Sequence, residues 1–361
     1  MTDAVLAGST RRSRIARETI DVVARELHDN RLFYTILALW LTYTVAGAVL
    51  REDGFIAELA EYGGRAARAA FILGCAAVVW AGARVLVARP EKPLKAMAAS
   101  LVDLLPGRMV ARYVYGFAVL AVFMAAFLHN KMLIPEISPF AWDETFARWD
   151  KALFGGYHPW QLLQPMFGYP VFTRIVDYAY VGWVPGVFLF WSWMIASRKV
   201  SPELRRQYWT ATVLSWILLG IVMATMLSSA GPCFTPMLFP AEAADYAPLN
   251  AYLADLHQTF ILSSSLTKEH LWDVYSGVST EPGGISAMPS MHNAQALLFV
   301  LAAYRVNRGL GHLMLLYAIL IFLGSILLAW HYAVDGLIGM AGAYAIWWIV
   351  GRYAQGRTSR A

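Results

Sequence analysis

Residues 312–352 read HLMLLYAILIFLGSILLAWHYAVDGLIGMAGAYAIWWIVGR. Two apolar stretches, 312–330 and 333–352, flank the motif His331-Tyr332-Ala333-Val334-Asp335. Each stretch has about the 20 mostly apolar residues that a helix needs to cross a bilayer. The sequence therefore predicts two membrane-spanning helices, joined by a turn that carries ionisable side chains.

The composition extends this prediction to the whole chain of 361 residues. Hydrophobic residues make up 58% of the sequence and charged residues only 15%, whereas soluble domains carry about 25% charged residues. The 14 Trp, 18 Tyr and 18 Phe exclude an intrinsically disordered chain. A net charge of +5 is mild and its basic residues lie at helix ends, so we expect no nucleic-acid partner. The fold class that remains is an all-α polytopic membrane protein.

Apolar stretches of suitable length predict about eight transmembrane helices. The six besides those just quoted are expected near 33–50, 70–88, 112–130, 176–196, 208–229 and 291–304. Lys and Arg gather in the segments that would face the cytoplasm if the N-terminus does, so both termini are predicted to be cytoplasmic. Residues 1–31 show no apolar region before the first span, so no cleavable signal peptide is expected.

Two long segments are predicted on the outer face. Residues 131–175 contain FARWDKALFGGYHPWQLLQPMF, in which Trp, Phe and Leu are mixed with charged residues. This pattern fits a helix lying at the membrane interface, and a plain connector is the alternative. Residues 230–290 are rich in Pro, Ser and Gly. A loop of that length is usually either functional or disordered.

The chemistry-bearing residues lie in two motifs on that outer face. The first is Ser286-Ala287-Met288-Pro289-Ser290-Met291-His292, and the second contains His331 and Asp335. On a helix, His331 and Asp335 would share one face because they are four residues apart. Together with His292 they would meet at one depth of the bilayer. Ionisable residues at a membrane edge are functional candidates because burying them there is costly.

Two histidines and one aspartate form a sufficient set for phosphoryl transfer through a covalent intermediate. A neutral imidazole can attack phosphorus, and a carboxylate on its other nitrogen fixes the tautomer. A second, protonated histidine can give a proton to the leaving oxygen. This mechanism requires neither a metal nor a cofactor. The other histidines are interpreted as ordinary satisfied residues; they include His129, His158, His257, His270 and His312.

The segment containing His292 resembles the second signature of the type 2 phosphatidic acid phosphatase superfamily, and His331 to Asp335 resembles the third. Within that superfamily the chain is most similar to the inositol phosphorylceramide synthase branch and its bacterial relatives. That similarity rests on Pro139-Phe140-Ala141-Trp142-Asp143, Asp150, Phe154-Gly155-Gly156 and Ser229-Ala230-Gly231-Pro232-Cys233-Phe234. The resemblance implies that His331 is the nucleophile, that Asp335 orients it, and that His292 is the acid–base group.

The resemblance also implies a six-helix catalytic core over residues 110–353. Two extra transmembrane helices in 33–109 would precede it, with cytoplasmic segments 1–32 and 354–361 at the ends.

The chain departs from the superfamily where the phosphate is normally held. The first signature, K-x6-R-P, is absent from residues 205–290, and Ser325 stands where the third signature has an arginine. The synthase branch also lacks the usual forms, so these departures favour that branch. Candidate substrate-binding groups are Lys268, Lys131 and Ser290, together with backbone N–H groups at Gly283-Gly284.

Three further acidic residues have structural explanations. Asp143 and Asp150 could bind substrate or a metal, and a helix-capping or solvated role is the favoured interpretation. Asp177 is expected to cap the start of the fourth span.

The predicted function is a membrane phosphotransferase that forms phosphohistidine. Its donor would be a phospholipid or lipid-linked phosphate, and its acceptor a lipid alcohol such as ceramide, with a phosphorylated inositol-type head group transferred. With water as acceptor, the protein would be a lipid phosphate or pyrophosphate phosphatase. A non-enzymatic lipid binder or transporter is the alternative from another class. The expected location is a bacterial inner membrane with a periplasmic site.

Overall fold

The computed structural model describes residues 24, 27–28, 30–104, 107–239 and 243–358. Within these residues every regular element is a helix. The expected cytoplasmic segment 1–32 lies almost entirely outside them. The chain divides into two compact units, one of residues 1–126 with 192–197 and one of residues 127–191 with 198–361.

The first unit contains long N-terminal helices. They are α2 (Arg31–Arg51), α3 (Phe55–Ala88), α4 (Pro93–Leu104) and the greater part of α5 (Gly107–Met132). Helix α2 covers the expected span at 33–50, and α3 contains the expected span at 70–88.

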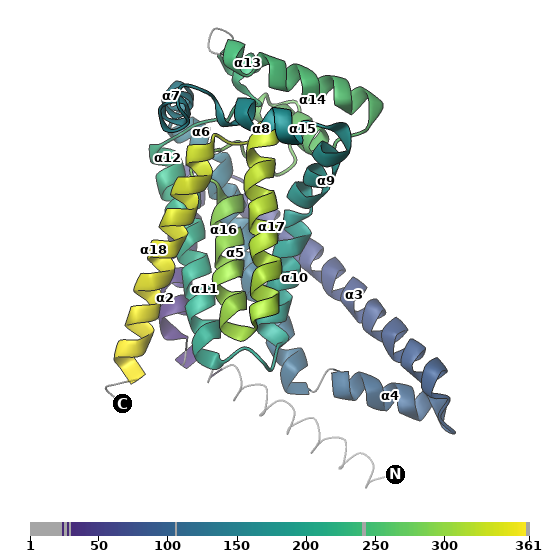
Figure 1. The fold of residues 1–361 in the computed structure, drawn as a ribbon. Helices are drawn as coiled ribbons and strands as arrows, with labels where there is room; N and C mark the ends of the chain where they lie inside the picture. The colour runs from purple at the N-terminus through teal and green to yellow at the C-terminus, as the bar shows by residue number, and fades with distance from the viewer. Residues whose placement is uncertain (1–23, 25–26, 29, 105–106, 240–242, 359–361) are drawn as a thin grey trace. The chain divides into compact units, whose positions relative to one another are not determined.

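The second unit carries every residue proposed for chemistry. Its long helices are the first part of α10 (Trp183–Ala196), α11 (Pro202–Ile217), α16 (Met291–Val306), α17 (Arg308–Leu327) and α18 (Ala333–Thr358). Helix α16 packs against α17, α18 and α11, while α17 also packs against α9 (Pro170–Val181). These helices run side by side in Figure 1. Apolar side chains such as Leu316 and Trp348 point outward from this bundle, as lipid-facing residues do.

Short helices gather at one end of this bundle, where α17 ends and α18 begins (Figure 1). They are α6 (Ile134–Ile137), α7 (Asp143–Leu153), α8 (Pro159–Phe167), α12 (Ala224–Met226), α13 (Thr235–Leu238), a 3₁₀ turn at Ala243–Asp245, α14 (Ala247–Thr259) and α15 (Ser263–Tyr275). The segment 131–175 is therefore helical, as the amphipathic pattern predicted, rather than a plain connector. Residues 230–290 are also largely helical, which the Pro, Ser and Gly content did not indicate.

The membrane-crossing helices were predicted better by position than by number. Five helices of the described residues are long and apolar enough to cross a bilayer: Arg31–Arg51, Val114–Ile137, Pro202–Met226, Arg308–Leu327 and Ala333–Tyr353. The pair Pro170–Val181 and Trp183–Ile195, bent by 46°, gives a sixth if it is one broken span. Helix α16 has 16 residues, fewer than the roughly 20 that a span needs. The polytopic helical class is confirmed, and the count of eight is not.

One local irregularity shapes the bundle near the end that carries the short helices. A π-helical segment, Leu218–Met223, continues α11, and such segments often occur near functional sites. A Cβ atom on its Gly220 would lie 2.9 Å from the ring of Phe127 and 3.2 Å from Met291. The glycine thus allows this helix to approach the start of α16 closely.

Candidate functional site

The two histidines of the sequence motifs meet at the end of the helical bundle. His292 lies in the first turn of α16, and His331 lies in the short connection between α17 and α18. Their ring centroids are 6.0 Å apart. The backbone N–H of His331 donates to the carbonyl of Ser325 over 2.9 Å, which ties the connection to the last turns of α17. The expected convergence of these residues is therefore present in the structure.

Asp335 holds the ring of His331 from the first turn of α18. Its Oδ2 lies 3.3 Å from His331 Nδ1 and also accepts the backbone N–H of Tyr332 over 3.1 Å. The second bond is half of a capping box, in which the third helical residue reaches back to the residue before the helix. His331 thus precedes the helix. It does not share a helical face with Asp335, contrary to the prediction from the spacing. The side chain of Asp335 turns back to reach it.

Burial controls the protonation of the His331 ring, whose exposed fraction is 6%. Burial lowers the pKa of His331 to about 3, and the positive charge of Lys131 acts in the same direction. The imidazole is therefore neutral at physiological pH. In the tautomer that directs Nδ1–H at Asp335, Nε2 carries the lone pair. This is the state that a nitrogen nucleophile requires.

Two carboxylates of α7 fix the turn that carries His331. Asp150 accepts the backbone N–H groups of Ala333 and Val334, at 2.8 and 3.0 Å, and so caps α18. Asp143 accepts those of Ala230 and Gly231, at 2.9 and 2.8 Å. It also accepts the hydroxyl of Tyr332 at 3.1 Å. Asp150 thus caps a helix, although it is α18 and not an interfacial helix, whereas Asp143 holds the non-helical segment at Ala230 and Gly231.

The burial of these two carboxylates is costly and is partly offset by their donors. Burial raises the pKa of Asp150 to about 7, while its two backbone N–H donors act in the opposite direction. Burial likewise raises the pKa of Asp143, opposed by its donors. Helix N-termini offer unpaired N–H groups and a positive dipole end, which explains why a carboxylate is placed at α18.

The segment 229–231 closes the turn from another side. Gly231 has a φ of 95°, and a Cβ atom there would lie 2.5 Å from the carbonyl oxygen of Trp330. Ser229 accepts the backbone N–H of Ala287 through its carbonyl and that of Met288 through its Oγ, at 2.9 and 3.2 Å. The two motifs with histidines are thereby joined through a third segment. Glycine is required at position 231 because of both its φ and this close approach.

Aromatic rings enclose His292 on both sides. The ring of Tyr180 stacks on it with centroids 4.4 Å apart, and the ring of Trp183 lies 4.2 Å away on a tilted plane. These residues stand on either side of the 46° bend between α9 and α10, at Gly182. Sequence reasoning singled out neither Trp183 nor Tyr180 as a neighbour of His292. The helix break, with Gly182 and Pro185 nearby, was the available signal.

The predicted phosphate-binding residues occupy different positions. Lys131, in the last turn of α5, lies within electrostatic range of both imidazole rings. Lys268, on α15, is half-buried and lies within such range of Cys233. Ser290 is buried and caps α16: its Oγ accepts from Asn293, and its own N–H donates to the carbonyl of Asp335. Gly284 packs closely on the backbone of Lys131. Binding of phosphate by any of them stays a prediction.

Asp177 caps a different helix from the one expected. It lies inside α9, and its two oxygens accept the backbone N–H groups of Ser263 and Ser264, each at 2.8 Å. These donors belong to the first turn of α15. The sequence could not indicate this because the donors are 86 and 87 residues away. The cap is one physical reason why residues 263–275 form a helix rather than a loop.

The remaining histidines have partners of their own. His158 Nε2 lies 3.0 Å from Asp245 Oδ2, and its Nδ1 lies 3.1 Å from the hydroxyl of Tyr246. Burial lowers the pKa of His158, and the neighbouring Lys151 lowers that of Asp245. The ring nitrogens of His257, His270 and His312 also have hydrogen-bonding neighbours. Among the described residues, no group of three or more His, Cys, Asp or Glu could hold a metal ion.

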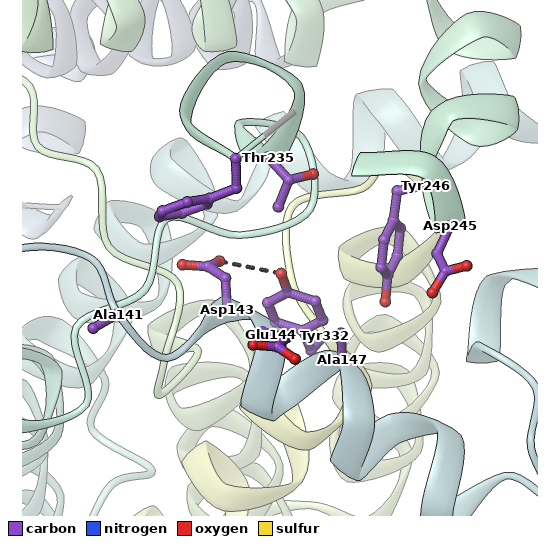
Figure 2. Close-up of a pocket in the computed structure, with 9 residues that line it drawn as sticks. Ala141, Asp143, Glu144, Ala147, Thr235, Asp245, Tyr246 and Tyr332 are labelled. Atoms are coloured by element: carbon purple, nitrogen blue, oxygen red, sulfur yellow. Dashed lines mark hydrogen bonds between the residues drawn. The ribbon is translucent and has the colours of Figure 1, made fainter. Parts of the chain in front are cut away.

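A cavity of about 120 Å³ lies beside the turn that carries His331 and Tyr332 (Figure 2). It is lined by Ala141, Asp143, Glu144, Ala147, Thr235, Phe239, Asp245, Tyr246 and Tyr332. Figure 2 shows the hydrogen bond between Asp143 and Tyr332 at its wall. Neither His292 nor His331 lines it, so it is separate from the histidine pair. The hydroxyl of Thr235 donates to the carbonyl of Pro232, and that of Tyr246 contacts His158, so these groups already have partners.

Comparison with known proteins gives one match. A family model described as the PAP2 superfamily matches residues 144–349. The match begins in α7 and includes both histidine motifs as well as most of α18. No curated protein and no solved structure matches the chain.

Proposed function

The chain belongs to the PAP2 superfamily, and from this membership and the geometry of the histidine pair we propose that it is a membrane enzyme that cleaves a phosphate ester of a lipid through phosphohistidine on His331. Membership supports phosphatase or phosphotransferase chemistry on lipid phosphates. The observation that carries the proposal is the arrangement of three side chains. His331 is held at Nδ1 by Asp335, and the ring of His292 lies 6.0 Å from it.

The first chemical step uses the neutral imidazole as nucleophile. The Nε2 lone pair of His331 forms an N–P bond, and the bond from phosphorus to the leaving alcohol oxygen breaks. His292, protonated, gives its proton to that oxygen, so the alcohol leaves neutral. The imidazolium that forms on His331 is stabilised through its Nδ1–H by the carboxylate of Asp335.

The second step reverses these roles. His292 takes the proton of an acceptor hydroxyl while that oxygen attacks phosphorus. The N–P bond breaks, and His331 returns to its neutral form. Microscopic reversibility makes the same histidine suitable as acid and base because the two steps are similar in opposite directions.

The negative charge that develops on the phosphoryl oxygens requires nearby donors. Lys131 is within electrostatic range of both rings, and Lys268 extends from α15 on the same end of the bundle. The N-termini of α16 and α18 both begin at the site, and their positive dipole ends favour an anion. Lys131 and Lys268 would therefore supply the charge that the missing signature residues supply in the superfamily.

We favour transfer to a lipid alcohol over hydrolysis. The motifs at Asp143 and Ser229–Phe234, shared with the inositol phosphorylceramide synthase branch, support this choice and are placed around the catalytic turn. A phosphorylated inositol-type head group would move from a phospholipid to an acceptor such as ceramide. The short helices at this end of the bundle would limit the access of water.

The proposal includes a topology. Eight spans, with a six-helix core over 110–353 and two helices before it, would place both termini in the cytoplasm. The site would then face the periplasm of a bacterial inner membrane. Labelling of single cysteines with an impermeant thiol reagent, placed in 276–282 and at the C-terminus, tests this side assignment.

Turnover of the purified protein in detergent tests the function. Radiolabelled phosphatidylinositol is offered with and without ceramide or diacylglycerol, beside the His331→Ala variant. We expect a labelled phosphorylated lipid that requires the acceptor and disappears in the variant. Release of free phosphate from simple lipid phosphates, also lost in the variant, would instead establish a phosphatase.

A covalent intermediate distinguishes an enzyme from a lipid binder or transporter. Rapid acid-free quenching in denaturant should trap label on the wild-type protein as an acid-labile, base-stable phosphoramidate. His331→Ala should carry none. Unchanged lipid binding in this variant, without labelling of the wild type by any lipid phosphate, would favour the binder.

A further inference from the structure

Tyr180 contacts both halves of the histidine site through one ring. The ring stacks on His292 with centroids 4.4 Å apart and planes at 12°, and on Trp330 with 6.2 Å and 21°. Trp330 directly precedes His331. Gly324 of α17 makes room for this ring, because a Cβ atom there would lie 3.1 Å from Tyr180 Cδ2. The last turn of α9 therefore inserts Tyr180 between the two histidine segments.

The hydroxyl of Tyr180 has no hydrogen-bonding role among the described residues. The residue is 3% exposed, and its Oη has no hydrogen-bond partner among the described residues. It lies within electrostatic range of Asp335 and Cys233. A buried phenol usually finds a partner, since an unsatisfied hydroxyl costs about 1–3 kcal/mol. A donor left unpaired at a site of this kind points to a ligand that pairs with it.

Two other polar side chains beside the histidines already have hydrogen-bond partners. Ser325 Oγ donates to the carbonyl of Phe322 over 2.7 Å. The side-chain amide of Asn293 lies between Ser290 Oγ and Ser325 Oγ, at 3.0 and 3.3 Å. Position 325 therefore offers neither a charge nor a free donor to a phosphate. Among the described residues, Tyr180 Oη and Trp183 Nε1 are buried donors beside His292 without a hydrogen-bond partner, and of the two only the Tyr180 ring also stacks on Trp330, which precedes His331.

We propose that Tyr180 Oη donates a hydrogen bond to a non-bridging phosphoryl oxygen of the substrate and of the transition state. This inference rests on the proposed function and adds a catalytic residue to it. A neutral donor fits the site because it supports the developing negative charge without adding a further cation to Lys131 and the protonated His292 near His331. Such preorganised donors in a site from which water is excluded are worth far more than in water.

The same stack makes Trp183 a positioning residue. It covers the other side of the His292 ring at 4.2 Å, so both faces of the imidazole are occupied. Only the ring edges, which carry the two nitrogens, can approach a substrate. The hydroxyl of Tyr180 and the nitrogens of His292 thereby lie on one packed unit built by the helix break at Gly182.

The test separates the hydroxyl from the ring. Tyr180→Phe keeps the stack and removes only the donor, and Tyr178→Phe is the matched control. Tyr178 lies on the same helix, its side chain is 54% exposed, and its hydroxyl accepts from Arg174. We measure kcat for the wild type and both variants. Binding of orthovanadate, which imitates the five-coordinate phosphoryl group, is measured by calorimetry on the same samples.

We expect Tyr180→Phe to lower kcat by about 10²-fold and to weaken vanadate binding by at least about tenfold. Tyr178→Phe should match the wild type in both. If Tyr180→Phe retains wild-type kcat and vanadate affinity, the inference is overturned, and Tyr180 only packs. If the wild type is active and His331→Ala is not, that failure leaves the proposed function intact. If the wild type neither turns over lipid phosphates nor binds vanadate, the proposed function and this inference fail together.

Discussion

Two histidine–aspartate pairs occur among the described residues of the second unit, and we propose only one of them as catalytic. The distance is 3.3 Å in His331–Asp335 and 3.0 Å in His158–Asp245, so the proposed catalytic pair is the longer of the two. In the first pair the aspartate is fully buried, and the ring of His292 lies 6.0 Å from that of the histidine. In the second, the aspartate is half exposed and shared with Lys151.

The surroundings of the histidine ring distinguish the two pairs. In His158 the second ring nitrogen contacts the hydroxyl of Tyr246 at 3.1 Å, so both nitrogens are occupied. The His331 side chain has Asp335 and the backbone of Ala287 as hydrogen-bonding neighbours, and the ring of His292 lies 6.0 Å away. A histidine that attacks phosphorus also needs an acid–base group nearby for the leaving oxygen, which His292 supplies in the proposed pair. Contact with a carboxylate alone therefore does not identify the nucleophile.

The largest expected effect comes from replacing the proposed nucleophile, His331. His331→Ala should lower kcat by at least about 10⁴-fold because no other nitrogen can form the intermediate. His158→Gln should retain most of the turnover, since His158 contacts neither His292 nor His331. Initial rates at saturating lipid measure both. Comparable losses in the two variants would show that the pairs cannot be distinguished by the surroundings of their rings.

The next effect concerns the partner of each histidine. Asp335→Asn should lower kcat by about 10²- to 10⁴-fold, because an amide can favour the wrong tautomer and no longer stabilises the imidazolium. Asp245→Asn removes only a half-exposed charge, for which ion pairing contributes little. The pH profile of kcat/KM should change for the first variant and remain as in the wild type for the second. Equal profiles would argue against a role for Asp335 in orienting His331.

The separation along the sequence between interacting residues explains how much of this site could be predicted. His292, His331 and Asp335 were found because short motifs carry them and because both motifs occur at span ends. The superfamily is confirmed by the match to residues 144–349. The capping of α18 by Asp150 joins residues 183 and 184 positions apart, and no local pattern encodes such a contact. Sequence reasoning favoured a capping or solvated role for Asp150 at an interfacial helix, and it did not indicate α18.

The fold also has features that local sequence predicts and features that depend on contacts between residues distant in the sequence. Apolar length predicted where helices such as α17 and α18 lie, because membrane crossing depends on local composition. Residues 230–290 were expected to be a long loop, yet they contain α14 and α15. One reason is that Asp177, from α9, satisfies the first N–H groups of α15. The donor Tyr180 was missed because an aromatic residue in an apolar helix is ordinary until its neighbours are known.

A smaller effect compares two carboxylates of similar geometry. Asp150 and Asp177 each accept two consecutive backbone N–H groups at a helix start, but only Asp150 caps the helix of the catalytic turn. Replacement of either by Ala should destabilise the protein by about 1–2 kcal/mol. Only Asp150→Ala should also lower kcat. Without the Asp150 carboxylate, the start of α18 no longer holds His331 and Asp335 firmly in position. Thermal unfolding and initial rates on the same samples measure the two effects. A loss of kcat in both variants would place the α15 cap in the catalytic machinery as well.

The smallest effect tests the protonation of the non-catalytic pair through its pH dependence. Burial holds the pKa of His158 below its ordinary value of 6.5, so below that pH the unfolded chain takes up a proton that the folded protein does not. The contribution of His158 to stability is then fully present above pH 6.5 and is lost as the pH falls. The difference in melting temperature between wild type and His158→Gln should shrink from pH 8 to pH 5. Asp150, whose pKa is about 7, titrates in both proteins and cancels in this difference. If the difference instead grows on acidification, His158 is protonated in the folded state and forms a true ion pair with Asp245. In that case contact with both a carboxylate and a hydroxyl would no longer be a sign of a neutral, structural histidine.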